Sequence, residues 1–328
     1  MKSNKLGFLI STVMMLLVLL MICFLSVRFV KKGTASMLFA DQGELRNTIE
    51  ISLSEAKDFS IAYTSDNIKV YPIEGDRVII KEYLSSRRNE DALATVNVGS
   101  GKATVIGGKR MQLSSFMWIS IDERIEIYLP KEGIENLELR TSSGNITAED
   151  EFVMIAKNVS VAAKSGNIKW QDTEALQVDL EASSGNLRVN RITADAILLT
   201  AKSGNITAEE MDGKAEVSAG SGNVTLENFS GNGSVSTQSG NVKVEAKEIK
   251  GDMSLEVGSG NLRLEIPDEL SFEAEINTGS GTIRTDFEHS IICNKSGNHA
   301  AGVVGEMPVG KLSLKAGSGN VSLKIADW

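Results

Sequence analysis

The residues best suited to chemistry are carboxylates that recur five positions after a repeated glycine. They are Glu149, Glu209, Glu227, Glu245, Glu265 and Asp286, and a column of threonine and basic residues precedes them by two positions. If successive copies of the repeat lie about 5 Å apart, neighbouring carboxylates reach the separation that retaining glycosidases use. The pattern therefore raises a glycan-cleaving enzyme as one hypothesis.

The same charges also fit a non-catalytic surface. An acid–base pair is expected as a local exception in a pocket, whereas these charges recur in copy after copy, as in stripes that keep a sheet soluble and block edge pairing. We therefore predict no catalytic residue and treat the stripe as a candidate interaction face. Its residues are Lys169, Arg188, Glu209, Glu227, Lys243, Glu245, Arg263, Glu265 and Arg284.

Other reactive side chains form no recognised motif. His289 and His299 lie near Cys293 without a metal-ligand spacing, and Cys23 lies in an apolar run far from Cys293. We predict no metal site, no cofactor and no small-molecule substrate. The chain carries a net charge of −9, and because residues 1–32 contribute +5, the remainder carries −14. Such an acidic body argues against nucleic-acid binding.

A repeated Ser-Gly-Asn turn must position these columns. The first seven turn glycines are 22, 19, 19, 18, 18 and 20 residues apart. The predicted structural turn residues are Gly144, Asn145, Gly166, Asn167, Gly185, Asn186, Gly204, Asn205, Gly222, Asn223, Gly240, Asn241, Gly260, Asn261, Gly319 and Asn320. Glycine permits positive φ, and asparagine can bond to nearby backbone or to the asparagine of the next copy. Further copies are Ser296-Gly297-Asn298, the variant Ser280-Gly281-Thr282, the weak Gly99-Ser100-Gly101-Lys102, and Ser65-Asp66-Asn67.

Residues around each turn alternate with period two, which predicts strands with one buried face. The position five before the glycine is always aliphatic, as in Leu139, Val161, Leu180, Leu199, Val217, Val235, Leu255, Ile276 and Leu314. A coil of about 19 residues cannot close its own core, but stacked coils can. The sequence therefore predicts an all-β fold, a single-stranded parallel β-solenoid.

An apolar segment precedes the repeats. No charged residue occurs from residue 7 to 27, a length that spans about 30 Å as a helix. Arg28, Lys31 and Lys32 follow directly, which favours an uncleaved transmembrane anchor over a signal peptide. Because large domains translocate largely regardless of charge, we expect the amino terminus inside and the body outside. We therefore expect a single-pass cell-membrane protein with an extracytoplasmic C-terminal domain.

Four segments follow from these patterns. Residues 1–32 are predicted to hold a cytoplasmic tail and the anchor, and residues 33–49 a juxtamembrane linker. Residues 50–140 are predicted to form the irregular opening of the solenoid and its cap, and residues 141–328 the regular solenoid. A cap is expected because a raw end would expose core and unpaired strand edges.

The chain resembles the bacterial "putative adhesin" domain family of β-solenoids. The resemblance rests on the sequence IEIYLP at residues 125–130, on the successive turns, and on the stretch from Ile266 to Gly281. It covers residue 50 to the end and implies a non-catalytic surface protein. With its short tail and one anchor, the chain is similar to the membrane-anchored member of Lia-type envelope-stress operons in Gram-positive bacteria.

The leading hypothesis is therefore a membrane-anchored, adhesin-like envelope protein. Its solenoid would present an interaction surface to a partner protein or wall polymer, as an accessory of the envelope-stress response. The first alternative is the glycan-cleaving enzyme. The second is a membrane-tethered cytoplasmic scaffold polymer, which requires the opposite orientation in the membrane.

Overall fold

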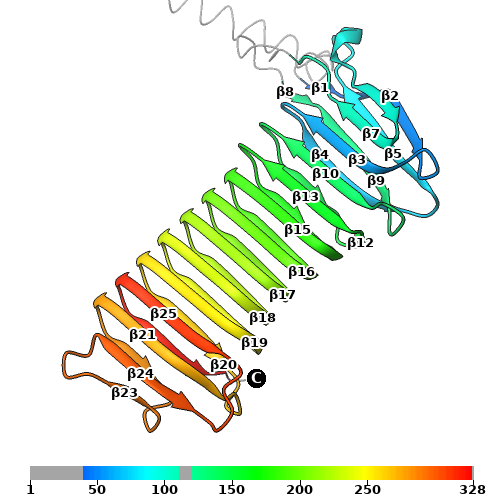
Figure 1. The fold of residues 1–328 in the computed structure, drawn as a ribbon. Helices are drawn as coiled ribbons and strands as arrows, with labels where there is room; N and C mark the ends of the chain where they lie inside the picture. Colours follow the sequence, from blue (N-terminus) through cyan, green and yellow to red (C-terminus); the bar gives the residue numbers. More distant parts are fainter. Residues whose placement is uncertain (1–39, 111–119, 327–328) are drawn as a thin grey trace, which may run out of the picture.

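Alternating residues on both sides of each Ser-Gly-Asn turn form strands that pair in parallel with the same strands of the next repeat. The computed structural model describes residues 40–110 and 120–326. Figure 1 shows these repeats as rungs of a long stack. The predicted all-β, parallel β-solenoid is confirmed, because residues five before successive glycines pair directly, as Leu180 with Leu199 and Leu199 with Val217.

Each rung has one strand before its corner and one after it. In the first rungs these are separate strands: β3 (Ala56–Tyr63) and β4 (Asn67–Ile73), β10 (Asn136–Thr141) and β11 (Ile146–Ala148), and β13 (Asn158–Ala163) and β14 (Ile168–Trp170). β12 (Val153–Ile155) lies on a third side. In the middle, long strands run from corner to corner: β15 (Asp172–Ser184), β16 (Leu187–Ser203), β17 (Ile206–Ser221), β18 (Val224–Ser239) and β19 (Val242–Ser259).

The core is one continuous column of aliphatic side chains inside the stack. Leu199, Ala201, Ile206 and Ala208 are fully buried in one rung, and their equivalents are buried in the rungs on either side. Large rings fill the space where the early rungs meet the third side: Trp170 is fully buried against the edge of Phe152. The polar residues between these positions face outward.

The last rung of the chain is not the last rung of the stack. β20 (Leu262–Ile266) is followed by β21 (Phe272–Ser280) and β22 (Ile283–Thr285), and then by β25 (Lys311–Ser318) and β26 (Val321–Ile325). β25 nevertheless pairs with both β19 and β21, and β26 with both β20 and β22. The rung of β25 and β26, called the terminal rung because it comes last in the sequence, therefore lies between two rungs that precede it in sequence (Figure 1).

An antiparallel hairpin explains this order. β24 (His299–Val304) pairs with the outer edge of β21, and β23 (Ile291–Cys293) pairs with β24. Because that edge is occupied, β25 must use the inner edge of β21. The predicted corner at Ser296-Gly297-Asn298 is wrong, since Gly297 lies in the turn of this hairpin and donates its N–H to Asn294. The position five before it, Ile292, is exposed.

The other end is built in the same way. β7 (Gly101–Ile106) pairs in parallel with β3, and β9 (Arg124–Pro130) with β4, so the first rung lies between the second and the third. Antiparallel strands finish this end: β6 (Thr95–Gly99) on β7, β5 (Arg77–Leu84) on β9, and β2 (Glu44–Ser52) on β5. A 3-10 helix, η1 (Glu90–Ala92), precedes β6, and β1 (Ala40–Gln42) pairs with β8 (Ser120–Asp122).

These strands refine three of the predictions. Ser65-Asp66-Asn67 is the first corner of the stack, whereas Gly99-Ser100-Gly101-Lys102 is the β6–β7 hairpin and not a corner. The predicted linker at residues 33–49 is too long, because β2 begins at Glu44 and buries Ile49. Residues 7–27, the predicted anchor, lie outside the described residues. Among the described residues, no helix has the length and apolar character that crossing a bilayer requires.

Candidate interaction site

The corners hold the outer faces in register because glycine allows the rungs to stack closely. A Cβ added to Gly204 would lie 1.9 Å from the carbonyl oxygen of Gly185, and the same clash recurs at every corner from Gly144 onward. Gly222 and Gly319 also have φ of +146° and +134°, values that side chains rarely adopt. The corner glycines are therefore required first by stacking and second by backbone conformation.

The corner asparagines form a ladder along the stack. The N–H of Asn205 donates to Oδ1 of Asn186 at 2.9 Å, and Oδ1 of Asn205 accepts from the N–H of Asn223 at 2.8 Å. The ladder begins at Asn67 and follows the spatial order of the rungs, from Asn261 to Asn320 and then to Thr282. These residues act in the fold, and they align the outward columns into flat faces.

The predicted interaction face lies on the strands that follow the corners. Register places Lys169 beside Arg188 and Lys243 beside Arg263. Between these two pairs of basic residues the column holds only Thr207 on β17 and Thr225 on β18. The basic residues of the predicted face therefore form two clusters, whereas Glu209, Glu227, Glu245 and Glu265 lie on four successive rungs, β17 to β20. Glu227 lies between the two clusters, and Arg284 lies at the far end on β22.

Most charges on this face are paired within the chain. Arg188 contacts Glu209 at 2.7 Å, Lys169 contacts Asp150 at 2.5 Å, and Arg263 pairs with Glu265. Lys243 pairs with Glu245, and its hydrogen bond holds the pKa of that carboxyl below the usual range. Exposed pairs of this kind stabilise little, typically below about 1 kcal/mol, and they leave few free groups for a ligand.

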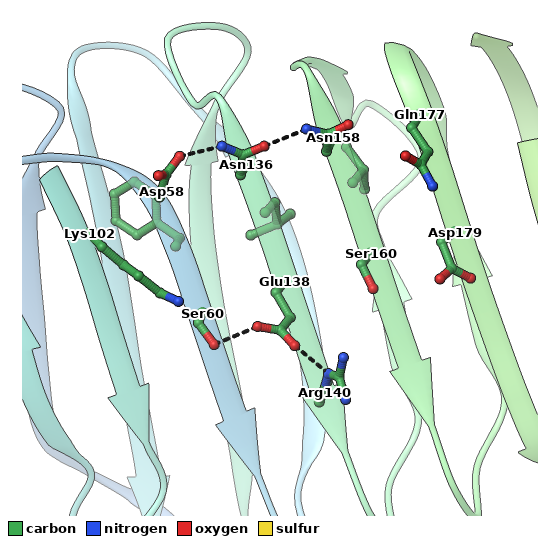
Figure 2. A pocket seen from close by; sticks show the side chains of 13 residues that line it. Asp58, Ser60, Lys102, Asn136, Glu138, Arg140, Asn158, Ser160, Gln177 and Asp179 are labelled. Carbon is green, nitrogen blue, oxygen red and sulfur yellow. Dashed lines mark hydrogen bonds and ion pairs between the residues drawn. The ribbon is translucent and has the colours of Figure 1, made fainter. Parts of the chain in front are cut away.

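A shallow hollow of about 420 Å³ lies on the other face, on the strands that precede the corners. Figure 2 shows its polar lining across neighbouring strands of the early rungs. The labelled residues are Asp58, Ser60, Lys102, Asn136, Glu138, Arg140, Asn158, Ser160, Gln177 and Asp179. The floor is low because Ser60 and Ser160 are short residues between longer ones.

Two hydrogen-bonded rows cross the hollow (Figure 2). In the upper row, Nδ2 of Asn158 donates to Oδ1 of Asn136 at 2.6 Å, and Nδ2 of Asn136 donates to Oδ1 of Asp58 at 2.5 Å. In the lower row, Glu138 accepts a hydrogen bond from Ser60 at 2.8 Å and contacts Arg140 at 2.6 Å. These contacts fix the orientation of donors and acceptors before any ligand arrives.

Asp179 continues the lower row without a partner. No residue within 40–110 or 120–326 forms a hydrogen bond or ion pair with its carboxylate, and no contact to it is drawn in Figure 2. Partial burial raises the pKa of Asp179, the nearby charge of Glu181 raises it further, and the charge of Arg140 opposes this shift. A half-buried carboxylate with unused acceptor sites is available to an external donor.

The sequence contained a signal for this hollow. Asp58, Asn136, Asn158 and Gln177 all stand eight positions before a corner residue, and Asp179 stands six before one. Both columns alternate with the buried ones and must face outward. The charged columns predicted from the sequence lie after the corner, and this column before the corner was not predicted.

Within the described ranges, no three or more histidine, cysteine or acidic side chains lie close enough together to hold a metal ion. Nδ1 of His299 lies 2.8 Å from Oδ1 of Asn277, and Cys293 is exposed on β23.

The solenoid architecture has a counterpart among protein families. The family model described as Toastrack DUF4097 matches residues 46–324. The chain belongs to this family. The matched range begins within β2 and ends within β26, so the Toastrack match includes both terminal caps and every rung.

Several solved structures are also similar to this chain. A "putative adhesin" from Bacteroides fragilis is 14% identical with a TM-score of 0.40, and 87% of this chain covers 99% of that one. A "putative adhesin" from Parabacteroides distasonis is 11% identical with a TM-score of 0.38, and 88% covers 100%. A "putative lipid binding protein" from the same species is 14% identical with a TM-score of 0.30, and 88% covers 100%. At such TM-scores these likenesses carry no functional inference. No curated protein matches the chain.

Proposed function

We propose that this Toastrack protein is a non-catalytic, membrane-anchored envelope protein whose rigid solenoid presents a binding face to a wall polymer. The apolar residues 7–27 would anchor it, and the acidic body would stand outside the membrane. The observation that supports binding most directly is the preorganised hollow with the unpaired carboxylate of Asp179.

The chemistry of the hollow suits a hydroxyl-rich polymer. Sugar hydroxyls donate and accept, and the lining offers carboxylate acceptors, amides that do both, and the cationic donors Lys102 and Arg140. Because the hollow is shallow, each contact is expected to be weak. A long polymer gains affinity when several neighbouring units or several anchored copies bind together.

The catalytic alternative receives less support from the geometry. The glycosidase hypothesis needs one carboxylic acid with a raised pKa beside an ionised partner. Glu245, one of the carboxylates in the predicted acidic column, has a lowered pKa because Lys243 donates a hydrogen bond to it. Glu245 lies at an outward position of β19.

Sedimentation with purified cell walls tests the binding face. The full chain in detergent micelles is expected to co-sediment with walls. The double variant Asn158→Ala/Asp179→Ala should bind at least about fivefold more weakly, because it loses about 1 kcal/mol of hydrogen bonding. Glu209→Ala, on the other face, is the matched control and should bind normally. Equal binding by all three proteins would exclude the hollow as the binding site. If none of the three proteins binds, a wall polymer is excluded as the ligand.

The exposed thiol of Cys293 reports the orientation. A membrane-impermeant maleimide should label it in intact cells, with Cys293→Ser as the control. Labelling only after permeabilisation would instead support the cytoplasmic scaffold. We also propose, from the resemblance to the Lia-type member, a role as an accessory of the envelope-stress response. Deletion of the chain should then change induction of that response by wall-active antibiotics.

A further inference from the structure

The terminal rung, β25–β26, fills a slot between two rungs that do not contact each other through backbone pairing. On one side, Leu312 and Leu314 pair with Met253 and Leu255 of β19. On the other side, Leu314 pairs with Ile276 of β21. The corner ladder also passes through it, because Asn320 donates to Asn261 at 3.0 Å and accepts from the N–H of Thr282 at 3.0 Å.

The C-terminal cap depends on this rung. Within the described residues, β21 pairs only with β24 and β25, and β22 pairs only with β26. Residues 267–304 are therefore joined to the body of the solenoid by the terminal rung and by the chain connection at Pro267. If the terminal rung left, the slot would expose the buried side chains of Leu255, Leu264 and Ile276.

The connection that leads into the terminal rung is short, and its last two residues already belong to the rung, because Val309 donates its N–H to Ser271 and Gly310 accepts from the N–H of Glu273. Residues 305–310 join β24 to β25, and Met307 is 83% exposed. Pro308 disfavours helical backbone at Met307 and so favours an extended course. In extended form the path from Val304 to Val309 reaches about 17 Å, enough to pass from one molecule to a neighbour in contact with it.

We propose that the slot is a binding site for the terminal rung of a second copy, so that two chains exchange β25–β26 and join at their C-terminal ends. The exchanged rung makes the same contacts in either chain, including the pairing of Lys315 with Glu256 at 2.8 Å and of Lys311 with Glu275 at 2.6 Å. Only residues 305–308 change conformation. Exchange of identical elements is a low-cost route to dimers, and its extent rises with protein concentration.

Two single-cysteine chains test the exchange. Ser254 of β19 and Ser313 of β25 are register partners on the outer face. Parallel neighbours about 5 Å apart suit a disulfide. Full-length Ser254→Cys and Ser313→Cys chains, each also carrying Cys23→Ser and Cys293→Ser, are mixed at high concentration in detergent micelles and oxidised. The expected product is a disulfide-linked heterodimer.

A second mixture supplies the matched control. Ser234 and Ser254 are also register partners, but on internal rungs that cannot exchange, so mixed Ser234→Cys and Ser254→Cys chains should stay monomeric. A chain carrying both Ser254→Cys and Ser313→Cys should close internally and confirm the geometry. The proposal is overturned if that chain closes while the mixed chains never link, or if both mixtures link equally. Neither result bears on wall binding, because the hollow lies on other rungs.

Discussion

Asp66 occupies the corner position that glycine holds in every rung from Gly144 onward, and its carboxylate is bound by Arg110. An added Cβ at each corner would point at the corner carbonyl of the rung before it, so Gly144 faces Asp66. Asp66 belongs to the first corner and has room for a side chain. Arg110 fills that room and also contacts Glu82 at 2.6 Å, and all three side chains are at most 2% exposed.

Removing Arg110 should therefore destabilise the N-terminal cap strongly. Arg110→Ala would leave Asp66 and Glu82 buried without their cation, and the expected loss in the free energy of unfolding is about 3–5 kcal/mol. Arg188→Ala, an exposed cation with one partner, should cost less than about 1 kcal/mol. Urea unfolding of the full chain, with hydrogen exchange at residues 60–110, measures both. Equal effects of the two changes would contradict the assignment.

Replacing Asp66 with glycine should reduce the loss of stability caused by Arg110→Ala. Burial raises the pKa of Asp66 while Arg110 lowers it, and Oδ2 of Asp66 is buried without a hydrogen bond inside the described ranges. Arg110→Ala with Asp66→Gly removes the uncompensated carboxylate together with its partner. The double variant is expected to be more stable than Arg110→Ala alone, and a double-mutant cycle measures the coupling. Additive effects would show that the two side chains act independently.

A single methyl group at a corner should disrupt the stack. Gly204→Ala would drive a Cβ against the backbone of the neighbouring rung and should lower the free energy of unfolding by about 3 kcal/mol. Gly99→Ala is the control, since nothing lies within 4 Å of its added Cβ, and it should change stability by less than about 0.5 kcal/mol. A tolerated Gly204→Ala would mean that the rungs are not stacked as closely as described.

The asparagine ladder should contribute modestly at each rung. Asn205→Ala removes the acceptor of the Asn223 N–H and should lower the free energy of unfolding by about 1 kcal/mol. Gln238→Ala, an exposed polar residue just before the Gly240 corner, should have a smaller effect. Matched denaturation curves distinguish the two. If Asn205→Ala behaves like Gln238→Ala, water replaces the ladder at no cost.

Asp179 should make stability depend on pH. The pKa of Asp179 is higher in the folded chain than in the unfolded chain. The stability that Asp179 contributes is therefore fully present below its pKa in the unfolded chain, and it is lost as the pH rises through its pKa in the folded chain. Asp179→Asn should therefore raise the free energy of unfolding at pH 7 and give no gain at pH 3. Asp150→Asn should have the opposite sign at pH 7, because the hydrogen bond from Lys169 lowers the pKa of Asp150. Urea midpoints at both pH values test this.

Much of the architecture could be predicted because the information is local. The alternation around Leu180 and Leu199 assigns each residue to the core or to the surface, and the turn residues between them recur at a nearly constant spacing. Identical coils that cannot bury their own aliphatic face must stack. The class of fold, the corners from Gly144 to Gly260 and the outward columns therefore follow from the sequence by itself.

The order of the rungs at the two ends was decided only by the tertiary structure. β25 could pair with either edge of β21 on local grounds, and the hairpin of β23 and β24 takes one edge and leaves the other. The pairing of Arg110 with Asp66 joins residues 44 positions apart. The hollow arises where short and long side chains of separate rungs meet. Each depends on which strands become neighbours, and nearly equivalent repeats cannot encode that choice locally.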